Sequence, residues 1–117
     1  MKIITIWEMK GDYLGEFEEL VLLMVAGLQE HAYAVAIKKE IELVAKRKVN
    51  ISAVHSALYR LEDKGFLSSH LGEASAKRGG KSKRLFDPTS AGLEALQTAK
   101  DLKEQLWRNI PQLSFSI

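Results

Sequence analysis

The side chains best suited to binding a charged partner are five cations that lie between Ala74 and Leu85, with no acid among them. They are Lys77, Arg78, Lys81, Lys83 and Arg84. Ammonium and guanidinium groups on a glycine-rich segment suit phosphate oxygens. A charge run by itself is more often a solvated loop, and the formal net charge of +2 is only mildly basic. The surrounding elements must therefore decide between the two interpretations.

A second group of hydrogen-bonding side chains lies on one predicted helix. Its members are Ser52, His55, Ser56, Tyr59 and Arg60. The last four stand, with Asp63, on the side opposite the apolar positions of that helix, and His55 lies one turn from Tyr59. Such groups can contact base edges and phosphates in a DNA groove, and Arg60 suits either a guanine or a phosphate. A solvated helix face explains this segment equally well, but the basic segment that follows favours DNA.

Apolar residues spaced by three and four predict two helices before this one. The first runs from Phe17 to Leu28, with acids near its start, where the helix dipole favours them. The second ends near Lys46, Arg47 and Lys48. Its predicted apolar positions are Tyr33, Val35, Ile37, Ile41 and Val44.

A short extended link from Val49 to Ile51 then leads to the third helix, which we expect Ser52 to cap and Gly65 to end. The apolar stripe predicted for this helix consists of Val54, Ala57, Leu58 and Leu61.

The basic segment forms the tip of a predicted hairpin. Its strands run from Phe66 to Leu71 and from Lys83 to Asp87, and Pro88 ends the second strand. Thr89 can cap a last helix, which carries apolar residues from Leu93 to Ile110 and stops at Pro111.

Three helices followed by a basic hairpin form the layout of a winged helix-turn-helix, in which the third helix enters the major groove. The fold class is therefore mainly α with a two-stranded β wing and a long carboxy-terminal dimerisation helix. We expect a single domain over residues 1–117, with a DNA-binding head over 14–88 and the last helix over 89–111.

Four stretches of the sequence resemble the PadR family of bacterial transcriptional regulators. They run from Leu14 to Leu22, from Ala32 to Ile37, from Ile51 to Gly65 and from Arg78 to Arg84. The most specific combination is Leu58-Tyr59-Arg60-Leu61-Glu62-Asp63-Lys64-Gly65 with the Arg78-Gly79-Gly80-Lys81 wing. The resemblance implies a dimeric, repressor-like regulator of the small branch with a single carboxy-terminal helix. His55 stands where the family usually has a tyrosine.

The last helix carries a wide apolar stripe that a head of this size can cover only in part. Its members are Leu93, Leu96, Ala99, Leu102, Leu106, Trp107 and Ile110. We therefore expect a homodimer with this stripe at the interface. Trp7 and Trp107 are most simply core or interface residues. The resemblance implies an alternative role in a pocket for a small apolar effector at the dimer interface, with Trp107 as the main candidate.

Other classes of function find little support in the sequence. There is no cysteine, and His31, His55 and His70 lack the spacing of a zinc site, so we expect no metal and no cofactor. No nucleophile with its base and no phosphate-binding glycine loop is recognisable, which argues against an enzyme. The apolar stretch from Ile3 to Trp7 is too short to span a membrane, so we expect a cytoplasmic protein. The alternative to a sequence-specific regulator of double-stranded DNA is a winged-helix module that binds protein or RNA.

Overall fold

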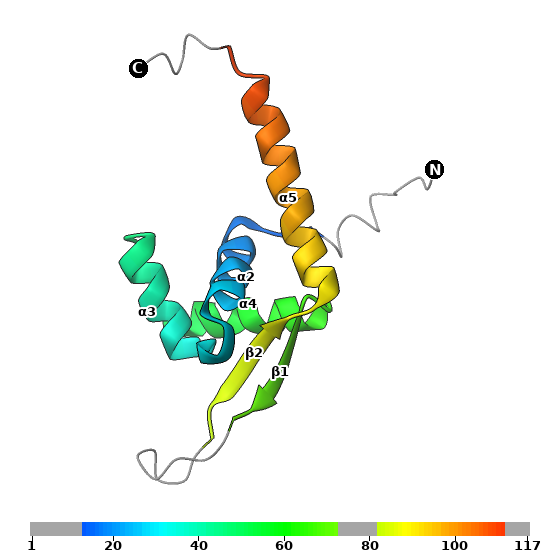
Figure 1. Ribbon diagram of the computed structural model, residues 1–117. Helices are drawn as coiled ribbons and strands as arrows, with labels where there is room; N and C mark the ends of the chain where they lie inside the picture. Colours follow the sequence, from blue (N-terminus) through cyan, green and yellow to red (C-terminus); the bar gives the residue numbers. More distant parts are fainter. Residues whose placement is uncertain (1–12, 73–81, 112–117) are drawn as a thin grey trace.

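The computed structural model describes residues 13–72 and 82–111, which form four α-helices, one turn of 3-10 helix and a two-stranded antiparallel sheet. In chain order these are α2 (Glu16–Leu28), η1 (Gln29–His31), α3 (Ala34–Val44), α4 (Ile51–Asp63), β1 (Leu67–Leu71), β2 (Arg84–Pro88) and α5 (Ser90–Arg108). Helices α2, α3 and α4 pack into a head, from which the hairpin and α5 leave in opposite directions (Figure 1). The predicted winged-helix layout is confirmed.

The core lies where the three helices of the head meet the base of the hairpin. Helix α4 contributes the four apolar residues predicted for its stripe, all of them fully buried. The buried hydrophobic residues of the described chain are Val21, Leu22, Val25, Ala32, Ala34, Ile37, Ile41, Val54, Ala57, Leu58, Leu61, Phe66, Leu67 and Phe86. Burial of these side chains supplies the main driving force for folding the head.

The buried face of α3 differs from the predicted one. Ile37 and Ile41 are buried as expected, but Val35 and Val44 are exposed and Ala34 is buried instead. Residues 34, 37 and 41 share one side of an α-helix, whereas residue 35 is rotated by roughly 100° from residue 34. The apolar residue types alone did not distinguish these two faces.

The start of α4 also differs from the prediction, because Asn50 caps the helix and Ser52 does not. The Asn50 side-chain oxygen accepts hydrogen bonds from the Ser52 backbone N–H at 2.9 Å and from the Ser52 hydroxyl at 2.7 Å. Asn50 has extended backbone angles, as a capping residue requires, while Ser52 already lies inside the first turn. The helix therefore begins two residues earlier than a Ser52 cap would place it, at Ile51.

The hairpin connects the head to α5 through backbone hydrogen bonds at its base. In the register of the sheet, Leu67 lies opposite Pro88 and Leu71 opposite Arg84.

The predicted cap of α5 is confirmed: the Thr89 hydroxyl oxygen accepts from the Gly92 N–H at 3.0 Å. The same hydroxyl donates to the Gly65 carbonyl at 2.6 Å, and Gly65 has the positive φ of 79° that favours glycine. The first turn of α5 is thus fixed to the end of α4.

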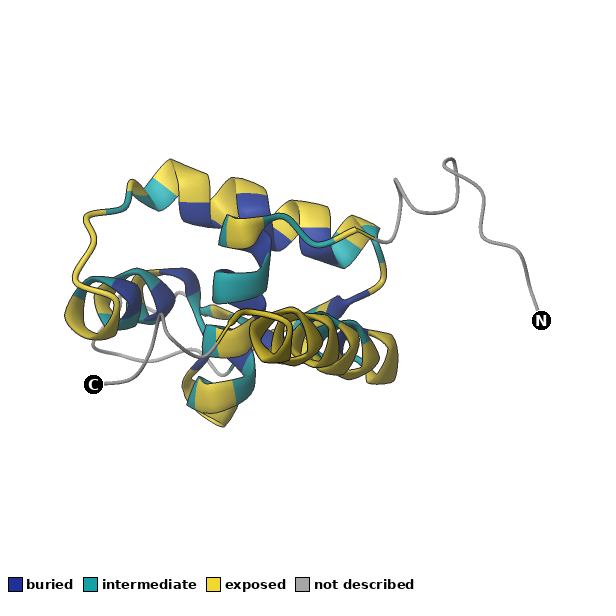
Figure 2. Cartoon of the chain, turned by 90° about the horizontal axis from the view of Figure 1, so that it is seen from above, coloured by how far each residue is buried: buried dark blue, intermediate teal, exposed yellow. Residues whose placement is uncertain are grey.

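Burial differs sharply between α5 and the head. The head helices alternate between buried and exposed positions, whereas α5 is exposed along most of its length (Figure 2). Leu96 and Ala95 pack against the core, but every residue from Asp101 to Arg108 is exposed. The distal half of α5 therefore buries none of its residues, and Lys103 pairs with Glu19 of α2.

Candidate nucleic-acid interface

The outward surface of α4 carries four of the five side chains predicted for it. Ser52, His55, Ser56 and Tyr59 are all exposed. The His55 and Tyr59 rings stack with their centroids 6.2 Å apart and an interplanar angle of 24°. The two rings therefore form a pair of hydrogen-bonding side chains on the exposed side of the helix.

The fifth side chain, Arg60, lies on a different flank of α4, beside the start of α2. Its Nε atom donates to Glu18 Oε2 at 2.8 Å, although the Arg60 side chain remains 52% exposed. The distance in sequence between these two residues meant that the apolar pattern of α4 could not predict the contact. Arg60 is therefore joined to α2 by this ion pair.

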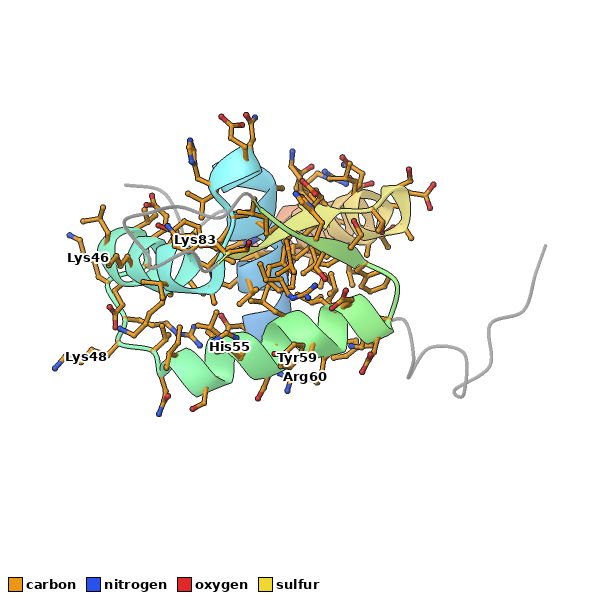
Figure 3. The ribbon with its side chains drawn as sticks, turned by 90° about the horizontal axis from the view of Figure 1, so that it is seen from below. Lys46, Lys48, His55, Tyr59, Arg60 and Lys83 are labelled. Atoms are coloured by element: carbon orange, nitrogen blue, oxygen red, sulfur yellow. The ribbon has the colours of Figure 1, made fainter. Side chains whose placement is uncertain are left out.

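The linker between α3 and α4 adds two exposed cations, Lys46 and Lys48. The sequence pattern indicated only that a helix ends near them. Lys46 has a φ of 54° and lies directly after the residue that caps the end of α3. Arg47 turns back onto α2. A terminal nitrogen of its guanidinium lies 2.9 Å from a carboxylate oxygen of Glu16, and its Cζ atom lies 5.2 Å from the centre of the Phe17 ring. Lys46 and Lys48, on either side of Arg47, are exposed. Seen from below, they lie beyond the amino-terminal end of α4 (Figure 3).

The wing contributes cations on the other side of α4. Lys83 lies to one side of α4 in Figure 3, near α3, with its ammonium group 3.7 Å from the centre of the Tyr33 ring. Arg84 donates to the Ser69 hydroxyl at 2.9 Å, and Ser69 donates to Glu62 of α4 at 2.6 Å. These contacts fix the base of the wing to the head. Lys77, Arg78 and Lys81, also predicted for the wing, lie outside the described residues.

Taken together, these elements surround the amino-terminal half of α4 with positive charge. Lys46 and Lys48 lie at its start and Lys83 at its side, while the helix dipole adds a partial positive charge at the same end. An exposed helix with polar side chains, flanked by cations, can place base contacts in a groove and phosphate contacts on both of its edges. The sequence signal for these linker cations is the run Lys46-Arg47-Lys48, a few residues before α4.

The apolar stripe of α5 meets α2 in a groove of about 570 Å³. Leu23, Leu93, Leu96 and Trp107 line it together with charged side chains, and Lys103 of α5 pairs with Glu19 of α2 at its edge. Trp107 is 60% exposed. Of the predicted stripe, Leu96 and Ala99 are half-buried, and Leu93, Leu102, Leu106, Trp107 and Ile110 are exposed. Trp7, the second predicted pocket residue, lies outside the described residues.

The described residues form neither a metal-binding cluster nor a single membrane-spanning helix. Residues 13–72 and 82–111 contain no group of three or more histidine, aspartate or glutamate side chains that could hold a metal ion. Over the same residues no single helix has the length and apolar character to cross a bilayer, and only the pair of α2 with η1 and α3, bent by 120°, meets that criterion in combination.

Comparison with known proteins gives a match at the level of structure. No protein-family model and no curated protein matches the sequence. A PadR-like transcription factor from Bacteroides fragilis matches with a TM-score of 0.69 and 22% identity, over 87% of this chain and 90% of that one. A PadR-like regulator from Bacillus cereus matches with a TM-score of 0.68 and 18% identity, over 95% and 99%. A PadR family regulator from Eggerthella lenta gives 0.64 and 22%, over 87% and 88%.

At these sequence identities the likeness establishes the fold. The chain has the winged-helix fold of PadR-like regulators, along nearly the whole length of those proteins.

Proposed function

We propose that this chain is a DNA-binding transcription regulator of the PadR type. The observation that carries the proposal is the exposed polar surface of α4, flanked by Lys46 and Lys48 at one end and by Lys83 at its side. The shared fold with PadR-like regulators supports the same assignment. In the proposed complex α4 lies in the major groove, His55, Ser56 and Tyr59 contact base edges, and the linker and the wing contact phosphates.

We propose further that the protein is a homodimeric repressor. The exposed apolar residues of α5 form one stripe and are not isolated surface leucines. A second copy of the chain would cover this stripe. A twofold dimer presents two copies of α4 to two half-sites related by the same symmetry. Repression would follow from occupation of a promoter by such a dimer.

The groove between α2 and α5 supports a small apolar effector as the signal that releases DNA. Its apolar lining comes from three leucines and Trp107, and charged side chains contribute the rest with Gln97. The test is whether apolar aromatic compounds dissociate the protein from its DNA. Compounds that act equally on the native chain and on Trp107→Ala would show that they bind elsewhere.

Selection of bound duplexes from a random DNA pool tests the proposed function. The expected result is an inverted repeat with half-site centres about one helical turn, roughly 10 base pairs, or a multiple of it apart. A protein that retains RNA or a protein partner but enriches no DNA sequence would support the alternative winged-helix module instead.

Replacement of both linker lysines, as Lys46→Ala with Lys48→Ala, should weaken binding to the selected site and to unrelated DNA by the same factor. The reason is that flexible ammonium groups neutralise phosphates without reading bases. The slope of log affinity against log salt should flatten by about one for each lost phosphate contact. The matched control is Lys39→Ala, an exposed lysine of α3. A loss confined to the selected site would assign the linker a role in base readout.

A further inference from the structure

Glu18 is the buried acid at the start of α2, with a side chain only 9% exposed. Three donors surround its carboxylate. The Gly15 backbone N–H donates to Oε1 at 3.3 Å, Lys64 Nζ donates to Oε1 at 2.7 Å, and Arg60 Nε donates to Oε2 at 2.8 Å. Burial acts to raise the pKa of Glu18, but the hydrogen bonds from Lys64, Arg60 and Gly15 outweigh it and hold the pKa below its ordinary value. Glu18 is therefore ionised and fixed in place.

The two cations held by Glu18 belong to α4 but differ in what they leave exposed. Lys64 is largely covered, with its side chain 20% exposed, and its ammonium group also donates to the Tyr13 carbonyl at 2.6 Å. Arg60 uses only its Nε atom, and its side chain remains 52% exposed. The edge of the guanidinium formed by its two terminal nitrogens makes no hydrogen bond to another described residue. That edge is the one that matches a guanine or a phosphate in bidentate fashion.

Fixing Nε determines where this edge points. A free arginine loses the freedom of several rotatable bonds when it binds DNA, and a side chain held beforehand loses less. The carboxylate also offsets part of the arginine charge, so that long-range attraction to phosphates is weakened while the directed hydrogen bonds are kept. Both effects favour recognition of one particular site over general attraction to DNA.

We propose that Glu18 is a positioning residue for sequence recognition: it holds Arg60 by Nε so that the terminal guanidinium edge reaches one base pair of the operator. This inference rests on the proposed DNA-binding function. It adds the first turn of α2 as a support for one side chain of α4. Glu18 itself touches no DNA in this arrangement.

The test compares Glu18→Gln with the native protein on the selected duplex and on unrelated DNA. We expect affinity for the selected site to fall about three- to ten-fold, which corresponds to the ordering of one rotamer-rich side chain. Affinity for unrelated DNA should stay equal or rise, because a negative charge beside the interface is lost. A role of Glu18 in folding alone would lower both affinities together, and that result would overturn the proposal.

A double-mutant cycle with Arg60→Ala identifies the residue through which Glu18 acts. Once Arg60 is absent, Glu18→Gln should cause no further loss at the selected site, and additive losses would contradict the proposal. Lys64→Met is the matched control, because it removes the other cation on the same carboxylate and should leave the ratio of specific to unrelated binding unchanged. Arg60→Lys provides an independent variant should Glu18→Gln fold poorly, and it should lower the same ratio because lysine lacks the two-pronged edge.

The outcomes separate this inference from the function on which it rests. A native protein that enriches no DNA sequence would overturn the proposed function. A native protein that enriches a sequence, together with a Glu18→Gln variant that binds selected and unrelated DNA as the native protein does, would overturn only the role of Glu18.

Discussion

Gly92→Ala should destabilise the protein by about 3 kcal/mol or more, because overpacking against backbone is at the costly end of small-to-large substitutions. A Cβ atom at residue 92 would lie 2.2 Å from the Phe66 carbonyl oxygen and 3.0 Å from its carbonyl carbon. Both are backbone atoms at the start of the hairpin, so no side chain can rotate away. The measurement is the free energy of unfolding in denaturant at a fixed protein concentration.

The clash at Gly92 can be relieved only by moving the first turn of α5 away from the hairpin. That movement would break the hydrogen bonds in which Thr89 accepts from Gly92 and donates to Gly65. Gly27→Ala is the matched control, because a Cβ at this exposed helical position meets nothing within 4 Å. Alanine there should stabilise the protein by up to about 1 kcal/mol. Equal effects of the two substitutions would contradict the close packing of α5 on Phe66.

Leu106→Asp should convert the proposed dimer into a monomer and lower affinity for an inverted-repeat operator by about 10²- to 10⁴-fold, since the second half-site would no longer be bound intramolecularly. Leu106 is 54% exposed in the single chain, so the substitution should leave the head folded. A twofold interface contains residue 106 of both chains. The substitution would therefore bury two unpaired carboxylates, which are costly to desolvate. Light scattering gives the oligomeric state, and a titration with operator DNA gives the affinity.

Gln105→Asp is the control for this prediction, because it introduces the same carboxylate at the neighbouring exposed residue, outside the apolar stripe. It should remain dimeric and bind DNA nearly as the native chain does. A Leu106→Asp protein that stays dimeric would move the interface away from the distal half of α5.

Much of the fold was predictable because it depends on local periodicity and on turn chemistry. The stripe of Val54, Leu58 and Leu61 indicated the buried side of α4, and Thr89 indicated the start of α5; both predictions are confirmed. Errors arose where two neighbouring residues could perform the same task. Asn50 and Ser52 are both good helix caps, and the structure selected Asn50 because its backbone is extended while Ser52 lies inside the first turn.

The candidate site was predictable in part. The residues of α4 that face outward follow from its amphipathic pattern, and Ser52, His55, Ser56 and Tyr59 are indeed exposed. The position of Arg60 did not follow, because its partner Glu18 is 42 residues away in sequence and approaches only where α2 crosses α4. The run Lys46-Arg47-Lys48 indicates only the end of a helix, whereas in the folded chain Lys46 and Lys48 lie beyond the start of α4.

The sequence by itself determined the order of the elements, the buried side of α4 and the cap of α5, because each depends on residues within a turn or two of one another. Only the tertiary structure decided the use of the acids at the start of α2. The helix dipole explains why Glu16, Glu18 and Glu19 are favourable there. In the folded chain each pairs with a different element: Glu16 with the linker, Glu18 with α4 and Glu19 with α5. Ion pairs between distant segments depend on how the helices cross, and that geometry is set by the packing of the whole core.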